Sequence, residues 1–467
     1  MSEKNKLAEK LLYAPKNGYD RLSAEDEKAM EAYCEDYKKF LNNGKTERLC
    51  VEYCIELAEK KGFKAYEAGM KLSAGDKVYF NNRGKGIMLA VIGREPIKKG
   101  FNLVGAHVDS PRLDAKPNPI TEDGSMAMIK THYYGGIKKY QWTAIPLTLS
   151  GTVIKKDGTR LDISLGGEGD DFCFTITDIL IHLASEQMKK TMSEGVEGEA
   201  LNVLAGGIPH FEENEESVKK AVLLLLREKY GIEEEELLTS ELEFAPAFPA
   251  KDVGLDKSFV GAYAQDDRVC AYSALQAILS VENPKKTAVC LLVDKEEIGS
   301  MGVTGMESRF FENTVADMID MSDEYSDLSL RHALSNSTCL SADVCAAFDP
   351  NYPAPFDKQN TPVAGGGIAL MKYTGARGKS GSSDASAELF ASVARIMNEN
   401  GVSWQTGELG KVDAGGGGTI AQFTANLNID TIDAGVPVLS MHSPFEVVSK
   451  IDLYETFRAY SAFYNFN

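Results

Sequence analysis

The sequence contains no long apolar run and no excess of positive charge. Its start, MSEKNKLAEKLLYAPKNG, has neither the apolar stretch of a secretory signal nor that of a membrane span, so we expect a cytoplasmic protein without a membrane partner. Lys and Arg number 50 against 69 Asp and Glu, a net charge of −19. Because this charge repels phosphate backbones, we expect no nucleic-acid partner either.

The cysteines lack the dense spacing of a disulfide framework. Eight of them are scattered along the 467 residues, and a cytoplasmic chain would keep them reduced. Cys50 and Cys54 are spaced like a metal-binding pair, but no second Cys or His pair lies close by in the sequence. We therefore interpret them as core thiols rather than zinc ligands. The sequence also shows no fixed-period repeat and no extended low-complexity tract.

The first part of the chain predicts helices followed by buried strands. LSAEDEKAMEAYCEDYKKFLNN opens with a capping box from Ser23 to Asp26, and TERLCVEYCIELAEKKGF begins at a Thr46 cap. The apolar segments 86–93 and 101–107 are bounded by turn signals. Short runs of this kind are typical of strands in a sheet that is covered on both faces.

The pattern changes at about Lys116 and changes back near residue 248. Alternating segments and a hairpin signal at Asp157-Gly158 predict a β-rich unit, which contains a charged helix from about Asn214 to Tyr230. The prolines of EFAPAFPAKDVGLD mark the return to alternating helices and strands. We predict an α/β domain of residues 1–115 and 249–467, interrupted by an inserted β-rich domain of residues 116–248.

Histidine and acidic residues follow several of the predicted strands and begin one predicted helix. They are His107, Asp109, Asp266, Asp267, Glu296, Glu297, Asp343 and His442. In open α/β sheets the carboxyl ends of the strands meet at one edge, and a mixed set of imidazole and carboxylate ligands suits zinc and related divalent ions. Taken singly, each residue also has a structural explanation: an Asp commonly caps a helix, and a lone His is commonly a hydrogen-bonded core residue.

Five motifs that contain these residues occur in the order known from one protein family. GAHVDSPRLDAKP, GAYAQDDRVCAY, VDKEEIGS, SADV and MHSPFE resemble the aspartyl aminopeptidase and aminopeptidase I family of dinuclear zinc exopeptidases, as do THYYGGIKKYQW and DAGGGGTIA. The resemblance implies a three-layer α/β/α catalytic domain with an inserted dimerisation domain. It also implies peptide substrates with a free N-terminus, two divalent metal ions, and a homo-oligomer that is a tetrahedral dodecamer built from dimers.

The resemblance also assigns a role to each residue. Asp266 would bridge both ions, and the remaining metal ligands would be His107 and Asp343 on one ion, with Glu297 and His442 on the other. Asp109 would orient His107, and Glu296 would be the general base that takes a proton from the attacking water. Zinc is expected, although manganese and cobalt accept the same ligands.

Some features leave alternatives open. His182 resembles a family histidine supplied by a neighbouring subunit, but an apolar helix face also suits a core residue, and the glycine-rich 413–421 is either a substrate contact or a tight connection. Lys372 falls where acidic-specific relatives carry a lysine, with Arg377 and Lys379 close behind. Because Asp267 and YQWTAIPL depart from those relatives, we favour a neutral or broad preference for the N-terminal residue.

Two other classes of function remain as alternatives. One is a different dinuclear hydrolase, such as a deacylase or a carboxypeptidase, that uses the same metal core. The other is a non-catalytic assembly or cargo-binding protein with the same fold. Glu296 argues against the second, because binding alone does not require a free general base beside a metal ligand.

Overall fold

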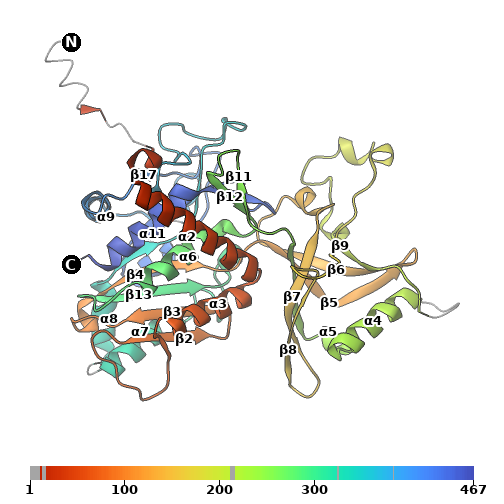
Figure 1. Ribbon diagram of the computed structural model, residues 1–467, viewed down its shortest axis with the longest axis horizontal. Coiled ribbons are helices and arrows are strands. Elements are labelled where there is room, and N and C mark those ends of the chain that lie inside the picture. Colours follow the sequence, from red (N-terminus) through yellow and green to blue (C-terminus); the bar gives the residue numbers. More distant parts are fainter. Residues whose placement is uncertain (1–10, 13–16, 211–215, 323–324, 382, 467) are drawn as a thin grey trace, which may run out of the picture.

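The protein consists of two lobes joined side by side (Figure 1). The computed structural model describes residues 11–12, 17–210, 216–322, 325–381 and 383–466, so most of the N-terminal stretch, together with Asn214, lies outside the described residues. Within the described ranges, no helix is both long enough and apolar enough to cross a membrane.

A nine-stranded sheet forms the centre of the larger lobe. Its order is β1 (Lys64–Ala65), β2 (Lys77–Asn82), β3 (Gly86–Val91), β13 (Thr287–Val293), β4 (Phe101–His107), β14 (Thr338–Ser341), β18 (Asp430–Gly435), β16 (Ile368–Met371) and β17 (Trp404–Thr406). The four strands from β13 to β18 are parallel. His107 pairs with Val293, so β4 and β13 end at the same edge of the sheet.

Helices cover both faces of this sheet. Successive side chains of a strand point to opposite faces, and both sets are apolar and buried here. In β13, Cys290 belongs to one core cluster and Leu291 to another. The first cluster includes α2 (Ala24–Asn43), α3 (Glu47–Lys60), α6 (Gln265–Leu279), α9 (Ala387–Glu399) and α11 (Lys450–Tyr464). The second includes α7 (Phe310–Ser322), α8 (Asp327–Ser335) and the flank of α10 (Ala421–Asn426). The predicted three-layer α/β/α architecture is therefore confirmed.

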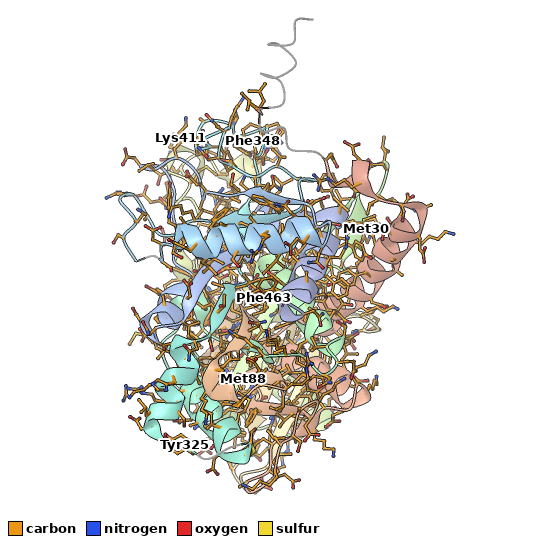
Figure 2. The ribbon with its side chains drawn as sticks, turned by 90° about the vertical axis from the view of Figure 1, so that its left-hand side faces the viewer. Met30, Met88, Tyr325, Phe348, Lys411 and Phe463 are labelled. Atoms are coloured by element: carbon orange, nitrogen blue, oxygen red, sulfur yellow. The ribbon has the colours of Figure 1, made fainter. Side chains whose placement is uncertain are left out.

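The predicted helix starts of this lobe are also confirmed. Ser23 and Asp26 form the capping box of α2, and the side chain of Thr46 accepts a hydrogen bond from the backbone N–H of Leu49 at the start of α3. In Figure 2, Phe463 of α11 lies in the middle of this lobe, and Phe348 and Lys411 lie at the end opposite Tyr325.

The smaller lobe is built on an antiparallel sheet with a core of its own. Its order is β8 (Arg160–Leu165), β7 (Leu147–Ile154), β10 (Ser240–Pro246), β5 (Arg112–Asp123), β6 (Met126–Tyr134) and β9 (Asn202–Gly206), with α4 (Ser217–Tyr230) and α5 (Glu234–Leu237) packed beside it. The predicted hairpin at Asp157-Gly158 is the β7–β8 connection. An inserted β-rich unit in an α/β chain is thus confirmed, while the boundaries at 116 and 248 stay predictions.

A five-stranded sheet lies beside the central one and was not predicted. It consists of β11 (Lys251–Val253), β12 (Phe259–Ala262), β20 (Glu446–Ser449), β19 (Pro437–Leu439) and β15 (Cys345–Ala346). These strands are short and come from distant parts of the chain, so no local pattern reveals their pairing. The turn between β19 and β20 carries His442.

Candidate metal centre

The parallel strands deliver the predicted site residues to one edge of the sheet. His107 is the last residue of β4, and Asp343 follows β14. Glu296 and Glu297 open a 3₁₀ turn, Glu296–Ile298, just after β13. Asp266 comes from the first turn of α6. This is the crevice outside the carboxyl ends of the strands, where α/β proteins form their sites.

Asp266 lies between two histidines. Its Oδ1 is 3.3 Å from Nε2 of His107, and its Oδ2 is 3.2 Å from Nε2 of His442. Nε2 of His442 also lies 3.3 Å from Oε2 of Glu297. Each oxygen of this one carboxylate therefore faces a different imidazole, which is the arrangement that a bridging ligand requires.

Two sets of ligand atoms are close enough to hold a cation. In each set, atoms from three residues lie within 4.8 Å of one another: His107 with Glu296 and Asp343, and His107 with Asp266 and Glu297. The first set contains Glu296, which the sequence assigned to base catalysis rather than to a metal. His442 belongs to neither set, but its Nε2 lies beside Asp266 and Glu297, so all the predicted ligands lie in one cluster.

Asp109 is a fully buried acceptor behind this cluster. Nδ1 of His107 lies 3.1 Å from its backbone oxygen and 3.3 Å from its Oδ1. The backbone N–H groups of Glu296 and Glu297 donate to its two carboxylate oxygens at 3.1 and 3.2 Å. Asp109 therefore fixes the ring of one predicted ligand and the turn that carries both glutamates.

The charges of the cluster fit a bound cation. Burial, reinforced by neighbouring carboxylates, raises the pKa of Glu297 and of Asp343 well above the ordinary values. Burial also acts to raise the pKa of Asp266, but hydrogen bonds from His107 and His442 outweigh it and hold that pKa below its ordinary value. Oε1 of Glu297 is buried and has no hydrogen-bond partner among the described residues. A divalent ion would satisfy this oxygen and offset the excess of negative charge.

Glu296 differs from its neighbour in exposure. About 18% of its side chain is exposed, against 4% for Glu297. Burial raises the pKa of Glu296 to about 7, helped by the charges of Asp266 and Asp109. A carboxyl group with a pKa near neutrality, on the accessible side of the cluster, has the properties of a general base.

Five residues of the cluster line a cleft of about 530 Å³: Asp266, Glu296, Glu297, Asp343 and His442. Gly415 to Gly418 of the glycine-rich segment line the cleft, as do Arg377 and Lys379. Lys372 is not among the described residues that line it: its ammonium group donates to Asp384 at 2.8 Å and to the backbone oxygen of Ala385 at 2.9 Å.

The structure corrects the interpretation of His182 as a possible core residue. The segment around it is an exposed 3₁₀ turn, Ile181–Leu183, rather than a buried helix face. The neighbouring apolar side chains are exposed as well: Ile179, Leu180, Ile181, Leu183, Met188 and Met192. Although this segment is apolar in sequence, its side chains are exposed, so it forms part of the surface and not of the core.

Glu446 is a site residue that the sequence analysis did not single out. Its carboxylate accepts the backbone N–H of His442 at 2.6 Å and that of Asp266 at 3.0 Å. Glu446 stands at the start of β20, in the five-stranded sheet that was not predicted. The only available signal was its place at the end of the MHSPFE motif.

An α/β/α domain with this cluster at the carboxyl edge of its sheet defines a metal-dependent hydrolase. Residues 40–464 match the aminopeptidase I zinc metalloprotease (M18) family. The chain belongs to this family.

Individual relatives agree with this assignment. A protein of Clostridium acetobutylicum named "Probable M18 family aminopeptidase 1" is 51% identical over 460 residues, which are 97% of this chain and 99% of that protein. The crystal structure of a Thermotoga maritima M18 aminopeptidase superposes with a TM-score of 0.93 at 45% identity, over 97% of this chain and 100% of that one. The S. cerevisiae mApe1 dodecamer has a TM-score of 0.74 at 22% identity, over 94% and 97% of the chains, and shares the fold.

Proposed function

We propose that this protein is a metallo-aminopeptidase that removes the N-terminal residue of peptides with the help of two divalent metal ions. The observation that carries the proposal is the position of Asp266, whose two oxygens face His107 and His442 separately. In this proposal His107 and Asp343 hold one ion, Glu297 and His442 hold the other, and Asp266 is shared. Zinc is the proposed metal because the family is one of zinc metalloproteases.

When bound, such an ion pair lowers the pKa of water and polarises the scissile carbonyl group. The residues of the chain supply the remaining steps. Glu296 accepts the proton of the attacking water and passes it to the amine of the leaving peptide. Asp109 holds the backbone of Glu296 and the ring of His107, so the base and a ligand keep a fixed relation to each other.

We further propose a neutral or broad preference for the N-terminal side chain. Recognition of an acidic side chain requires a fixed cation in the site. Of the three candidate cations, Lys372 lies outside the lining of the cleft, and both Lys372 and Lys379 are paired with Asp384. Arg377 and Lys379 line the cleft, to which Met371, Met441 and Phe423 contribute apolar surface.

A substrate panel tests the proposed activity. Metal-loaded protein is expected to cleave peptides with a free N-terminus and to leave the same peptides uncut when the N-terminus is acetylated. A carboxypeptidase would cleave the acetylated peptides but not peptides with a blocked C-terminus. A deacylase would prefer the acetylated form. Activity that survives N-terminal blocking would therefore refute the proposal.

The proposed assembly is a tetrahedral homododecamer built from dimers of the inserted domain. The exposed apolar side chains around His182 support an interface on this domain, because an exposed apolar stretch of this kind marks a contact surface. The division into a catalytic domain (1–115 and 249–467) and a dimerisation domain (116–248) is part of this proposal. Light scattering that found only active monomers of 50.9 kDa would refute it.

We also propose a cytoplasmic location. The eight cysteines are all free thiols in the structure, and seven of them are buried. A reducing compartment suits this pattern.

A further inference from the structure

The middle of the sequence motif THYYGGIKKYQW lies beside the metal centre. Tyr134, the last residue of β6, donates from its hydroxyl group to Oδ2 of Asp109 at 2.8 Å. Two residues on, the backbone oxygen of Gly136 lies 2.8 Å from Nδ1 of His442. The segment Tyr134–Gly136 thus reaches from the inserted sheet to both sides of the cluster.

These contacts determine which nitrogen of each histidine is available. A carbonyl oxygen only accepts hydrogen bonds, so Nδ1 of His442 must carry the hydrogen and Nε2 is left to face Asp266 and Glu297. The same argument applies to His107, whose Nδ1 faces the backbone oxygen and the carboxylate of Asp109. Tyr134 acts on His107 indirectly, by fixing that carboxylate.

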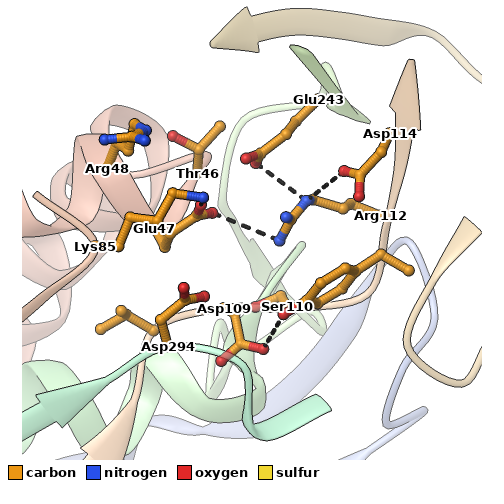
Figure 3. A network of polar contacts seen from close by, with 12 residues as sticks. Thr46, Glu47, Arg48, Lys85, Asp109, Ser110, Arg112, Asp114, Glu243 and Asp294 are labelled. Carbon is orange, nitrogen blue, oxygen red and sulfur yellow. Dashed lines mark hydrogen bonds and ion pairs between the residues drawn. The ribbon is translucent and has the colours of Figure 1, made fainter. Parts of the chain in front are cut away.

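A buried group of charges packs against Tyr134. It includes Arg112, Glu243 and Glu47, whose contacts are shown in Figure 3. The guanidinium group of Arg112 lies 3.8 Å from the centre of the Tyr134 ring. Arg112 is in turn paired with Glu243 of β10 at 3.2 Å and with Glu47 of α3 at 3.5 Å. One of these partners belongs to the inserted sheet and the other to the catalytic lobe, so the tyrosine sits at a junction between them.

Gly135 allows the segment to come this close. Its φ of +72° lies in the left-handed region, and a Cβ added there would stand 3.4 Å from both Cβ and Oε2 of Glu297. These are contact distances without overlap, so a side chain at this position would act by straining the backbone between Tyr134 and Gly136, next to a proposed ligand.

We propose that Tyr134–Gly136 of the inserted domain is a positioning element for the metal site. Tyr134 orients His107 through Asp109, and the carbonyl group of Gly136 orients His442. The inference rests on the proposed function, because it concerns the ligands of the same two ions. Its consequence is that the seating of the inserted domain on the catalytic lobe sets the affinity for metal.

Tyr134→Phe and Tyr133→Phe form a matched pair of variants. Each removes a single hydroxyl group from β6, but Tyr133 is 43% exposed while Tyr134 is 8% exposed. Zinc affinity of the metal-free full-length protein would be measured by competition with a chromophoric chelator. Y134F is expected to weaken zinc binding by about 10–100-fold, the usual effect of losing such a supporting contact, while Y133F stays within about twofold of the wild type.

Gly135→Ala and Gly158→Ala give an independent test, which also applies if Y134F does not fold. Both glycines belong to the inserted lobe and have positive φ, +72° and +84°, but a Cβ at Gly158 would meet nothing within 4 Å. Both variants are expected to lose stability, and only G135A is expected to weaken zinc binding. Equal zinc affinity in the two would overturn the inference.

The outcomes separate this inference from the proposed function. Wild-type zinc affinity in folded Y134F would overturn the positioning role even if the enzyme cleaves peptides. Weakened zinc binding in Y134F would support the positioning role even if the wild type failed on the peptide panel, a failure that would contradict the aminopeptidase activity alone.

Discussion

The adjacent glutamates allow a direct test of the proposed chemistry. Glu296→Gln keeps the shape of the side chain but removes its ability to take a proton. The loss of a positioned general base lowers kcat by about 10²–10⁴-fold, which corresponds to about 2.7–5.5 kcal/mol of activation free energy. Metal content should stay close to that of the wild type, because the proposal assigns Glu296, whose side chain is about 18% exposed, to proton transfer and not to either ion.

Glu297→Gln is the matched comparison and should fail in a different way. This carboxylate is 4% exposed and lies 3.3 Å from Nε2 of His442. At an effective dielectric constant of about 20, one unit charge at about 4 Å contributes about 4 kcal/mol to the attraction of another. Because the proposed ion carries two charges, loss of the carboxylate charge is expected to weaken binding of the adjacent ion by at least about 10³-fold, and turnover falls because the ion is lost.

The assay combines two measurements on each variant. Zinc content is determined by atomic emission after dialysis against buffered zinc, and turnover is measured on a peptide with a free N-terminus at saturating substrate. Excess zinc should restore activity to E297Q but not to E296Q. If E296Q lost its zinc while E297Q kept both zinc and turnover, the proposed division of labour between the two glutamates would be wrong.

Three further predictions concern metal binding, pH dependence and substrate preference. Chelation should abolish activity, and Asp266→Asn should lower the occupancy of both metal positions, so full occupancy with normal turnover in that variant would contradict the bridging role. Burial raises the pKa of Glu296 to about 7, and bound cations would lower it, so the carboxyl group should become protonated at pH 7 or below. Only the ionised form can act as a base, so kcat/KM should fall about tenfold per pH unit below that pKa. This acidic limb of the pH profile should be absent in E296Q. Lys372→Ala should leave the ratio of kcat/KM for Asp and Glu over Leu and Met substrates within about threefold, and a preference of about 100-fold for acidic residues, about 2.7 kcal/mol, that disappeared in the variant would show an acidic-specific enzyme.

Local signals were sufficient to predict the elements that carry the site. The apolar segment 101–107 is β4 with the same bounds, and the caps at Ser23 and Thr46 begin α2 and α3. These features depend on neighbouring residues, so the sequence contains them. The convergence of the ligands could be predicted because residues at the carboxyl ends of parallel strands share one edge, and because the five motifs resemble those of a known family.

Features that depend on distant pairing could not be predicted. The five-stranded sheet joins β12 to β20, and these strands are far apart in the sequence. The contact of Tyr134 with Asp109 depends on how the inserted lobe sits on the catalytic one, which no local pattern encodes. The environment of His182 could not be predicted, because the apolar residues around it suit a buried helix as well as the exposed turn that the structure has.

The order of the central strands has a consequence for the nascent chain during translation. Strand β4 is synthesised before the insertion, but both of its neighbours, β13 and β14, are synthesised after it. His442 arrives later still, after all the other proposed ligands and before any residue of β20 or α11. A nascent chain on the ribosome therefore holds β4 without its neighbouring strands and lacks part of the proposed ligand set, so it cannot cleave peptides by the proposed mechanism until His442 has been added.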